Sequence, residues 1–186
     1  MPRPAIFLDR DGVINVGVKG DYIRNVSQLR WLPGVPQAVA ALSNAGWPIV
    51  VITNQSGIAR GLYTMTDVSE IHQRIRSVIQ QAGGDITAFY VCPHRDEDRC
   101  ACRKPLPGML SQAARDYDLD LAHSFFIGDT EIDARAGRAA GCAVITVATG
   151  LTPAEEVKRW PSPPDHIFNS LMEAAEWINR CGSDPS

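Results

Sequence analysis

The amino-acid sequence predicts an α/β fold, a doubly wound and mostly parallel sheet with helices on both faces. Short apolar runs alternate along the chain with longer segments whose composition suits helices. The clearest run, Ile49–Ile52, is apolar at every position. A parallel strand that is buried on both faces has this character, because neither side of it meets water.

The expected strands are short runs that end at polar or turn-forming residues. They are Ala5–Asp9, Pro48–Thr53, Ile86–Val91, Ser124–Gly128, Ala143–Val147 and His166–Phe168. The expected helices lie between or after them, at about Val35–Ala45, Thr66–Ala82, Pro107–Tyr117, Thr130–Ala140 and Ser170–Asn179. Glycines stand where three of these helices should end, at Gly46, Gly83 and Gly141, and Thr66 is the expected N-cap of the second helix.

The chain has 186 residues, which is enough for one domain with its own core. No stretch rich in Gly, Ser or Pro divides it, so we expect a single domain over residues 1–180 and a flexible tail over residues 181–186. The net charge of −3 and the lack of clustered basic residues argue against a nucleic-acid partner.

Targeting and membrane signals are absent from the sequence. The longest apolar stretches are far shorter than the roughly 20 residues that span a bilayer, and residues 1–4 lead directly into the first expected strand without a secretory signal. We therefore expect a cytoplasmic protein without a membrane partner. An odd count of 5 cysteines argues against a disulfide framework.

Polar residues follow several of the expected strands, where the ligand crevice of an open α/β sheet lies. Asp9 and Asp11 follow the first strand, Thr53 and Asn54 the second, and Asp129 and Asp133 the fourth. Taken singly, each pair is also typical of an ordinary turn or helix cap. Together they would bring carboxylates to one crevice, where they could hold Mg²⁺ against a phosphate group.

A cluster of soft ligands follows the third strand, in the stretch "CPHRDEDRCACRKP". Three cysteines and one histidine fall within eleven residues and match a closed tetrahedral zinc site: Cys92, His94, Cys100 and Cys102. A closed site has no open position for a substrate, so the expected zinc is structural. Arg103 and Lys104 come directly after it, as a pair of cations carried by the same loop.

Four segments, "FLDRDGVIN", "TNQSGIARG", "CRKPLPGML" and "FIGDTEIDARAG", resemble the four signature motifs of the haloacid dehalogenase (HAD) superfamily of phosphatases. The resemblance covers about Ala5 to Thr149. It implies a Rossmann-like HAD fold, here without a large cap domain. More narrowly, the cysteine-rich loop resembles that of phosphatases that remove the 7-phosphate of D-glycero-D-manno-heptose 1,7-bisphosphate, in the synthesis of ADP-heptose and lipopolysaccharide core precursors.

The resemblance implies a role for each aspartate. Asp9 would attack phosphorus and form an aspartyl-phosphate, while Asp11 would act first as general acid and then as general base. Mg²⁺ would be held by Asp9, by the backbone carbonyl of Asp11 and by Asp129, with Asp133 acting through water. Many relatives carry a lysine directly after the aspartate of the fourth motif, whereas this chain has Thr130.

The same resemblance assigns the remaining site residues. Thr53 and Lys104 would bind the transferring phosphoryl group. The substrate-binding residues would come from three loops: Lys19, Gly20, Asp21, Tyr22, Asn54, Gln55, Ser56, Arg60 and Arg103. The implied partner is a phosphorylated sugar, and we expect a monomer.

Three other functions stay open at the level of sequence. A histidinol-phosphate phosphatase would share the aspartates and the zinc loop, although the basic loop with Arg60 favours a bisphosphate. A Mg²⁺-dependent phosphotransferase would differ only in the acceptor. A non-catalytic zinc-binding module would explain the cysteines but would leave Asp9, Asp11 and Asp129 without a role.

Overall fold

Six parallel strands form the central sheet of the computed structural model, which describes residues 1–150 and 152–181. They are β1 (Ile6–Leu8), β2 (Ile49–Asn54), β3 (Ala88–Cys92), β4 (Phe125–Gly128), β5 (Ala143–Val147) and β6 (His166–Phe168). Their order across the sheet is β3-β2-β1-β4-β5-β6. The chain runs outward from β1 in one direction and then restarts at β4 on its other side, so a topological switch point lies between β1 and β4.

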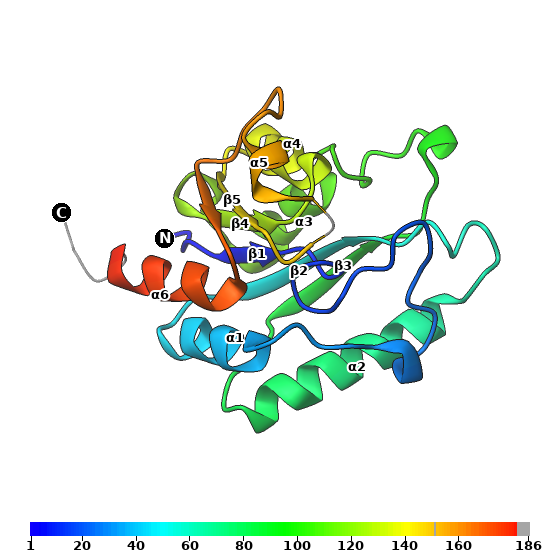
Figure 1. Ribbon diagram of the computed structural model, residues 1–186, viewed down its shortest axis with the longest axis horizontal. Coiled ribbons are helices and arrows are strands. Elements are labelled where there is room, and N and C mark those ends of the chain that lie inside the picture. Colours follow the sequence, from blue (N-terminus) through cyan, green and yellow to red (C-terminus); the bar gives the residue numbers. More distant parts are fainter. Residues whose placement is uncertain (151, 182–186) are drawn as a thin grey trace.

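The helices cover both faces of the sheet, as Figure 1 shows. They are α1 (Val35–Asn44), α2 (Met65–Gln81), α3 (Gly108–Tyr117), α4 (Glu131–Ala140), α5 (Ala154–Val157) and α6 (Leu171–Cys181). Buried side chains of α1, α2 and α6 pack on one face, and those of α3 and α4 on the other. Three short 3₁₀ helices lie in the described connections, at Val26–Gln28, Asp96–Asp98 and Leu121–His123.

The strands are apolar on both sides because each side faces a layer of helices. In β1, Ile6 and Leu8 belong to the core under α1, α2 and α6, whereas Phe7 belongs to the core under α3 and α4. Phe7 pairs in register with Phe126 of β4, and both rings are fully buried. This alternation follows from the two-residue period of a strand.

The predicted doubly wound α/β fold is confirmed, and the predicted strands and long helices are found within two residues of their expected bounds. The predicted N-cap of α2 is wrong. Thr64, not Thr66, caps this helix, because its hydroxyl accepts from the Asp67 amide and the Asp67 carboxylate accepts from the Thr64 amide. The sequence pattern does not predict the short α5.

Helix α6 continues through Cys181, the residue at which the sequence predicts that a flexible tail begins. The rest of that predicted tail, residues 182–186, lies outside the described residues. No helix in the described part of the chain is both long and apolar enough to cross a membrane.

Candidate active site

Three buried carboxylates meet at the carboxyl ends of β1 and β4. Asp9 follows β1, Asp129 follows β4, and Asp133 lies in the first turn of α4. One oxygen from each of these carboxylates lies within 4.8 Å of the others, and all three residues are at most 8% exposed. Like charges gathered away from water destabilise one another, so this group favours a bound cation.

Lys104 supplies one cation to this group. Its Nζ lies 2.8 Å from Oδ1 of Asp9 and 2.6 Å from Oδ1 of Asp133, and it donates to the backbone oxygen of Ile52 at 3.0 Å. The side chain is 3% exposed. Burial acts to lower the pKa of Lys104, but Asp133 and Asp9 outweigh that effect and raise it, so the ammonium stays charged.

The carboxylate of Asp133 is fully engaged, whereas that of Asp129 is not. The second oxygen of Asp133 accepts from the Thr130 hydroxyl at 2.6 Å, in the capping box that begins α4. By contrast, Oδ1 of Asp129 is buried with no hydrogen-bond partner among the described residues. A buried acceptor of this kind is costly unless something satisfies it, and a metal ion would do so.

Two glycines leave room around Asp129. A Cβ at Gly12 or at Gly150 would collide with the Asp129 carboxyl group, and Gly12 also has a positive φ of 93°. The glycine in "DRDGV" therefore does more than allow a turn, because it lets the backbone after β1 approach the carboxylate after β4. The donor set of hard carboxylate oxygens, one of them unsatisfied, fits Mg²⁺.

The pKa values of two carboxylates reflect burial and the crowding of negative charge. Burial raises the pKa of Asp9 to about 7, with Asp133 and Asp11 adding to the effect and Lys104 opposing it. Burial also raises the pKa of Asp129 to about 8, and the charges of Asp9 and Asp133 add to it. A divalent cation would stabilise both ionised forms.

Asp11 points to a different set of partners, although it stands only two residues from Asp9. Its carboxylate accepts from Arg10 at 2.9 Å, from Asn15 at 2.8 Å and from Gln55 at 2.9 Å. Burial acts to raise the pKa of Asp11, but the Arg10 charge and the hydrogen bonds from Asn15, Arg10 and Gln55 outweigh it and lower the pKa. The Asp11 side chain is 30% exposed and lines the site.

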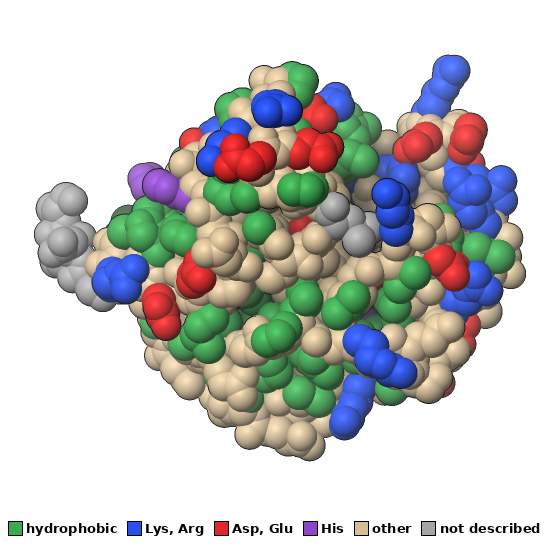
Figure 2. Space-filling view, in the orientation of Figure 1, with side chains coloured by type: hydrophobic (Ala, Val, Ile, Leu, Met, Phe, Trp, Pro, Cys, Tyr) green, Lys and Arg blue, Asp and Glu red, His purple; other side chains and the backbone are tan. Residues whose placement is uncertain are grey.

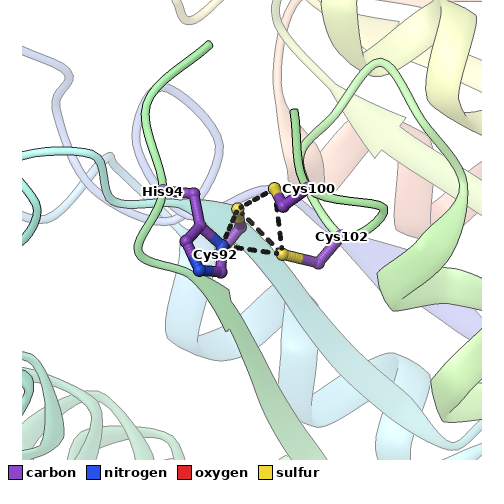
Figure 3. A group of neighbouring side chains, drawn as sticks. All are labelled: Cys92, His94, Cys100 and Cys102. Carbon is purple, nitrogen blue, oxygen red and sulfur yellow. Dashed lines mark hydrogen bonds between the residues drawn. The ribbon is translucent and has the colours of Figure 1, made fainter. Parts of the chain in front are cut away.

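The soft ligands after β3 converge as the sequence predicts. Figure 3 shows Cys92, His94, Cys100 and Cys102 facing a common centre. The sulfur of Cys102 lies 3.1 Å from that of Cys92, 3.4 Å from that of Cys100 and 3.3 Å from Nδ1 of His94. Tetrahedral zinc with bonds of about 2.3 Å would set its sulfur ligands about 3.8 Å apart. The four residues therefore fit a structural zinc ion.

The zinc-ligand loop (residues 92–104) places its last residues over the catalytic crevice. Arg103 bonds Asp96 at 2.5 Å and the His94 carbonyl at 3.2 Å, both within the loop. The Asn54 side chain pairs with the backbone of Lys104 in both directions, at 3.0 and 3.1 Å. The end of β2 and the zinc-ligand loop together thus set where Lys104 enters the carboxylate group.

A cavity of about 200 Å³ opens onto these residues. Its walls are Asp9, Asp11, Thr53, Asn54, Arg103, Lys104, Thr130, Ile132 and Asp133. A second cavity of about 200 Å³ adjoins it, under the loop that carries Asp21 and Tyr22. A roomier cavity, about 610 Å³, lies between α2 and the edge strand β3. It contains no member of the carboxylate group, so we place the chemistry in the smaller ones.

The remaining predicted residues are spread around these cavities. Tyr22 bonds Ser56 at 3.0 Å, and Asp21 pairs with Arg24 at 2.7 Å. Gln55 is 1% exposed and bonds inward to Asp11 and Thr53. Lys19, Gly20 and Arg60 are exposed. Figure 2 shows Lys and Arg side chains gathered on the side of the molecule where the zinc-ligand loop lies.

Sequence reasoning missed the support behind Asp11. Arg10 is wholly buried, and its Nη1 lies 3.5 Å from Nε2 of His72. Burial and the charge of Arg10 lower the pKa of His72 to about 3, so that ring is neutral. Tyr63 donates to Gln55 at 2.6 Å. One signal was available, because Arg10 is a charged residue inserted between two aspartates at the end of a buried strand.

Comparisons with known proteins identify the family of this chain. A HAD-hydrolase-like family model matches residues 101–174. A protein of Pseudomonas aeruginosa named D-glycero-beta-D-manno-heptose-1,7-bisphosphate 7-phosphatase is 43% identical over 150 residues, covering 81% of this chain and 84% of that protein. The D-glycero-D-manno-heptose-1,7-bisphosphate 7-phosphatase of Thermosynechococcus vestitus is 42% identical over 191 residues, covering 96% of each chain.

A solved structure shares the fold closely. It is the D,D-heptose 1,7-bisphosphate phosphatase of B. bronchiseptica, complexed with magnesium and phosphate, with a TM-score of 0.89 and 39% identity over 95% of this chain and 98% of that one. With relatives of this identity and coverage, the chain belongs to the HAD-like hydrolases and is a phosphatase, a phosphoric monoester hydrolase.

Proposed function

We propose that this phosphatase removes the 7-phosphate of D-glycero-D-manno-heptose 1,7-bisphosphate through an aspartyl-phosphate intermediate. The observation that carries the proposal is the separation of carboxylates. Asp9 lies in the group that could hold a metal, and Asp11, two residues later, is held apart from it by its own donors. The two carboxylates thus meet different partners, which is why we assign them different roles. The relatives' names support the choice of substrate.

In this proposal Asp9 is the nucleophile. Its carboxylate lines the cavity and is positioned by Lys104, which contacts one of its oxygens at 2.8 Å. Attack on phosphorus forms the aspartyl-phosphate and breaks the bond to the sugar oxygen at C7. Asp11 gives that oxygen a proton, and it later takes a proton from the water that hydrolyses the intermediate.

Lys104, Thr53 and Mg²⁺ serve the phosphoryl group. The Lys104 ammonium, held between Asp9 and Asp133, offsets charge on the transferring oxygens, and the Thr53 hydroxyl lines the same cavity. Mg²⁺, held by Asp9 and Asp129 with Asp133 acting through water, would supply further charge stabilisation there. Thr130 serves as the N-cap of α4, and Lys104 supplies the cation at this site.

The second phosphate would meet the cations of the zinc-ligand loop. A cavity of about 300 Å³ lies beside the catalytic one and shares Arg103 and Lys104 with it, and Arg95 and Arg99 complete its basic wall. Guanidinium groups bind phosphate through paired hydrogen bonds. A substrate with phosphates at both ends would thus be held at both ends, with the sugar between the two cavities near Arg103.

We also propose a cytoplasmic location and a structural zinc. Three thiols that face one centre without forming a disulfide suit a reducing compartment, where disulfides are rare. The closed donor set leaves no position for a substrate.

Asp9→Asn should lower kcat/KM for heptose 1,7-bisphosphate by at least about a thousandfold, because an amide cannot form the aspartyl-phosphate. The rate of phosphate release with Mg²⁺ present measures this loss of activity. Asp116→Asn, which changes an exposed partner of Tyr90, should retain full activity. Full turnover by Asp9→Asn would reject the nucleophile, and faster hydrolysis of histidinol phosphate than of the bisphosphate by the unaltered enzyme would reject the substrate.

A further inference from the structure

The largest fully buried side chain of the described residues is a charged one, Arg10, and the proposed chemistry gives it no role. Burying a guanidinium is costly unless it is paired. Its partner is Asp11: Arg10 reaches one carboxylate oxygen at 3.2 and 3.3 Å and the other at 2.9 Å. Well-packed apolar residues often replace such pairs without loss of stability, so stability alone does not explain this one.

Gln55, which directly follows β2, contacts the same carboxylate. Its Nε2 donates to Asp11 and to the Thr53 hydroxyl, at 2.9 Å in each case. The orientation of this amide is fixed, because its Oε1 accepts from Tyr63 at 2.6 Å. A reversed amide would set its oxygen against the Asp11 carboxylate. One buried side chain thus ties the proposed proton carrier to a residue of the phosphate cavity.

The effect of these donors is to hold Asp11 away from the metal group. Both oxygens of Asp11 already accept hydrogen bonds, and the carboxylate is not part of the Asp9, Asp129 and Asp133 group. One edge of it still faces the catalytic cavity, since the side chain is 30% exposed whereas Arg10 is 0% exposed.

We propose that Arg10 and Gln55 are positioning residues that hold the Asp11 carboxylate toward the leaving oxygen and apart from the metal group. The inference rests on the acid and base roles proposed for Asp11. Its distinctive consequence is a dependence on the leaving group. A sugar alkoxide needs the proton that Asp11 carries, whereas p-nitrophenolate leaves without one.

The test compares kcat/KM for heptose 1,7-bisphosphate and for p-nitrophenyl phosphate, since kcat/KM reports on the steps up to cleavage of the ester. Arg10→Met should lower kcat/KM for the sugar bisphosphate by about a hundredfold and kcat/KM for the aryl phosphate by less than about fivefold. The difference arises because only the sugar leaving group needs the proton that a displaced Asp11 no longer delivers. Gln55→Met should lower the sugar value by about tenfold with the same selectivity. Arg138→Met, at a half-exposed pair with Asp165, should change neither value.

Arg10→Lys separates charge from orientation, because it keeps the cation but cannot contact both oxygens as a planar fork does. We expect it to show most of the Arg10→Met defect. Thermal unfolding identifies the variants that fold, and if no Arg10 variant folds, Gln55→Met decides the question. Equal losses for both substrates, or no loss in any folded variant, would overturn the inference.

Asp11→Asn distinguishes this inference from the proposed function. If Asp11→Asn retains activity on the sugar bisphosphate, the acid role itself is wrong. If Asp11→Asn loses that activity while Arg10→Met and Gln55→Met retain it, the acid role stands and the positioning role fails.

Discussion

Single aspartates at this site have different environments, although they share a residue type. Asp9 and Asp129 are crowded by like charge and shielded from water, which raises the pKa of each. Asp11 receives donors on both oxygens, which lowers its pKa despite burial. The three carboxylates come from two short motifs that look alike in sequence. Their different partners, rather than their residue type, decide which could hold a metal and which could carry a proton.

The raised pKa values predict how stability depends on pH when Mg²⁺ is absent. The folded protein keeps protons on Asp9 and Asp129 to about pH 7 and about pH 8, whereas the unfolded chain loses them near 3.8. Because the folded state binds more protons in this range, the free energy of unfolding should fall as pH rises from about 4 to about 8. Urea unfolding at a series of pH values measures this free energy. The buffer should be free of Mg²⁺ and should contain no chelator, because a chelator would remove zinc.

Two controls accompany that titration. Adding Mg²⁺ should stabilise the protein more at pH 8 than at pH 5, because the cation competes with protons for the same oxygens. Asp129→Asn should flatten the pH dependence, since it removes the group whose pKa is about 8. A Mg²⁺-free protein whose stability rises over this range would contradict the assignment.

At the scale of elements, the site depends on the segments that come directly after the strands. The loop after β3 is long and polar, and a zinc ion held by its four candidate ligands would cross-link it in place of a hydrophobic core. Arg103 and Lys104 come directly after its last candidate ligand, so a well-ordered loop also fixes the positions of these two cations. Helix α4 contributes through its N-cap, where Thr130 holds one oxygen of Asp133 and leaves the other for Lys104.

Cys102→Ser should lower bound zinc from about one ion per chain to a small fraction, because serine is a poor zinc ligand. It should also weaken activity by about tenfold or more, since Lys104 then enters the site from a loosened loop. Metal analysis and kcat/KM measure the two effects. Cys181→Ser, at an exposed cysteine outside the cluster, should change neither. Purified protein without zinc would reject the structural metal.

At the scale of the whole molecule, the sheet order brings together residues that are distant in sequence. Strand β1 lies between β2 and β4, so the ends of all three strands meet at one edge. Lys104 reaches Asp9 across 95 positions and Asp133 across 29. The core beneath them is continuous with the site, because the Lys104 ammonium stands 5.6 Å from the centre of the Phe126 ring.

Phe126→Ala should lower the free energy of unfolding by about 3–5 kcal/mol, because it opens a cavity in the core under α3 and α4. We expect reduced activity as well, since the Phe126 ring lies next to the Lys104 ammonium and helps to position it. Urea unfolding with Mg²⁺ present measures the stability. Leu62→Ala, at a side chain that is 43% exposed, should have little effect on either property. An equal loss in both variants would contradict this account.

The sequence by itself determined the features that depend on near neighbours. Alternating apolar runs predicted the strands, and polar residues at their ends predicted which positions would face a crevice. The convergence of the four candidate zinc ligands could be predicted because they lie within eleven residues. Even local patterns misled once, at the N-cap of α2, where two threonines compete and the reciprocal bond with Asp67 selects Thr64.

Only the tertiary structure decided which residues of the site contact one another. Nothing in the alternation of strands and helices specifies that Lys104 lies between Asp9 and Asp133, or that Gln55 reaches Asp11 across 44 positions. Those contacts depend on strand order and on the path of long loops, which arise from packing of the whole chain. The sequence thus named candidate residues for the site, and packing decided which of them lie together and how their partners shift their pKa values.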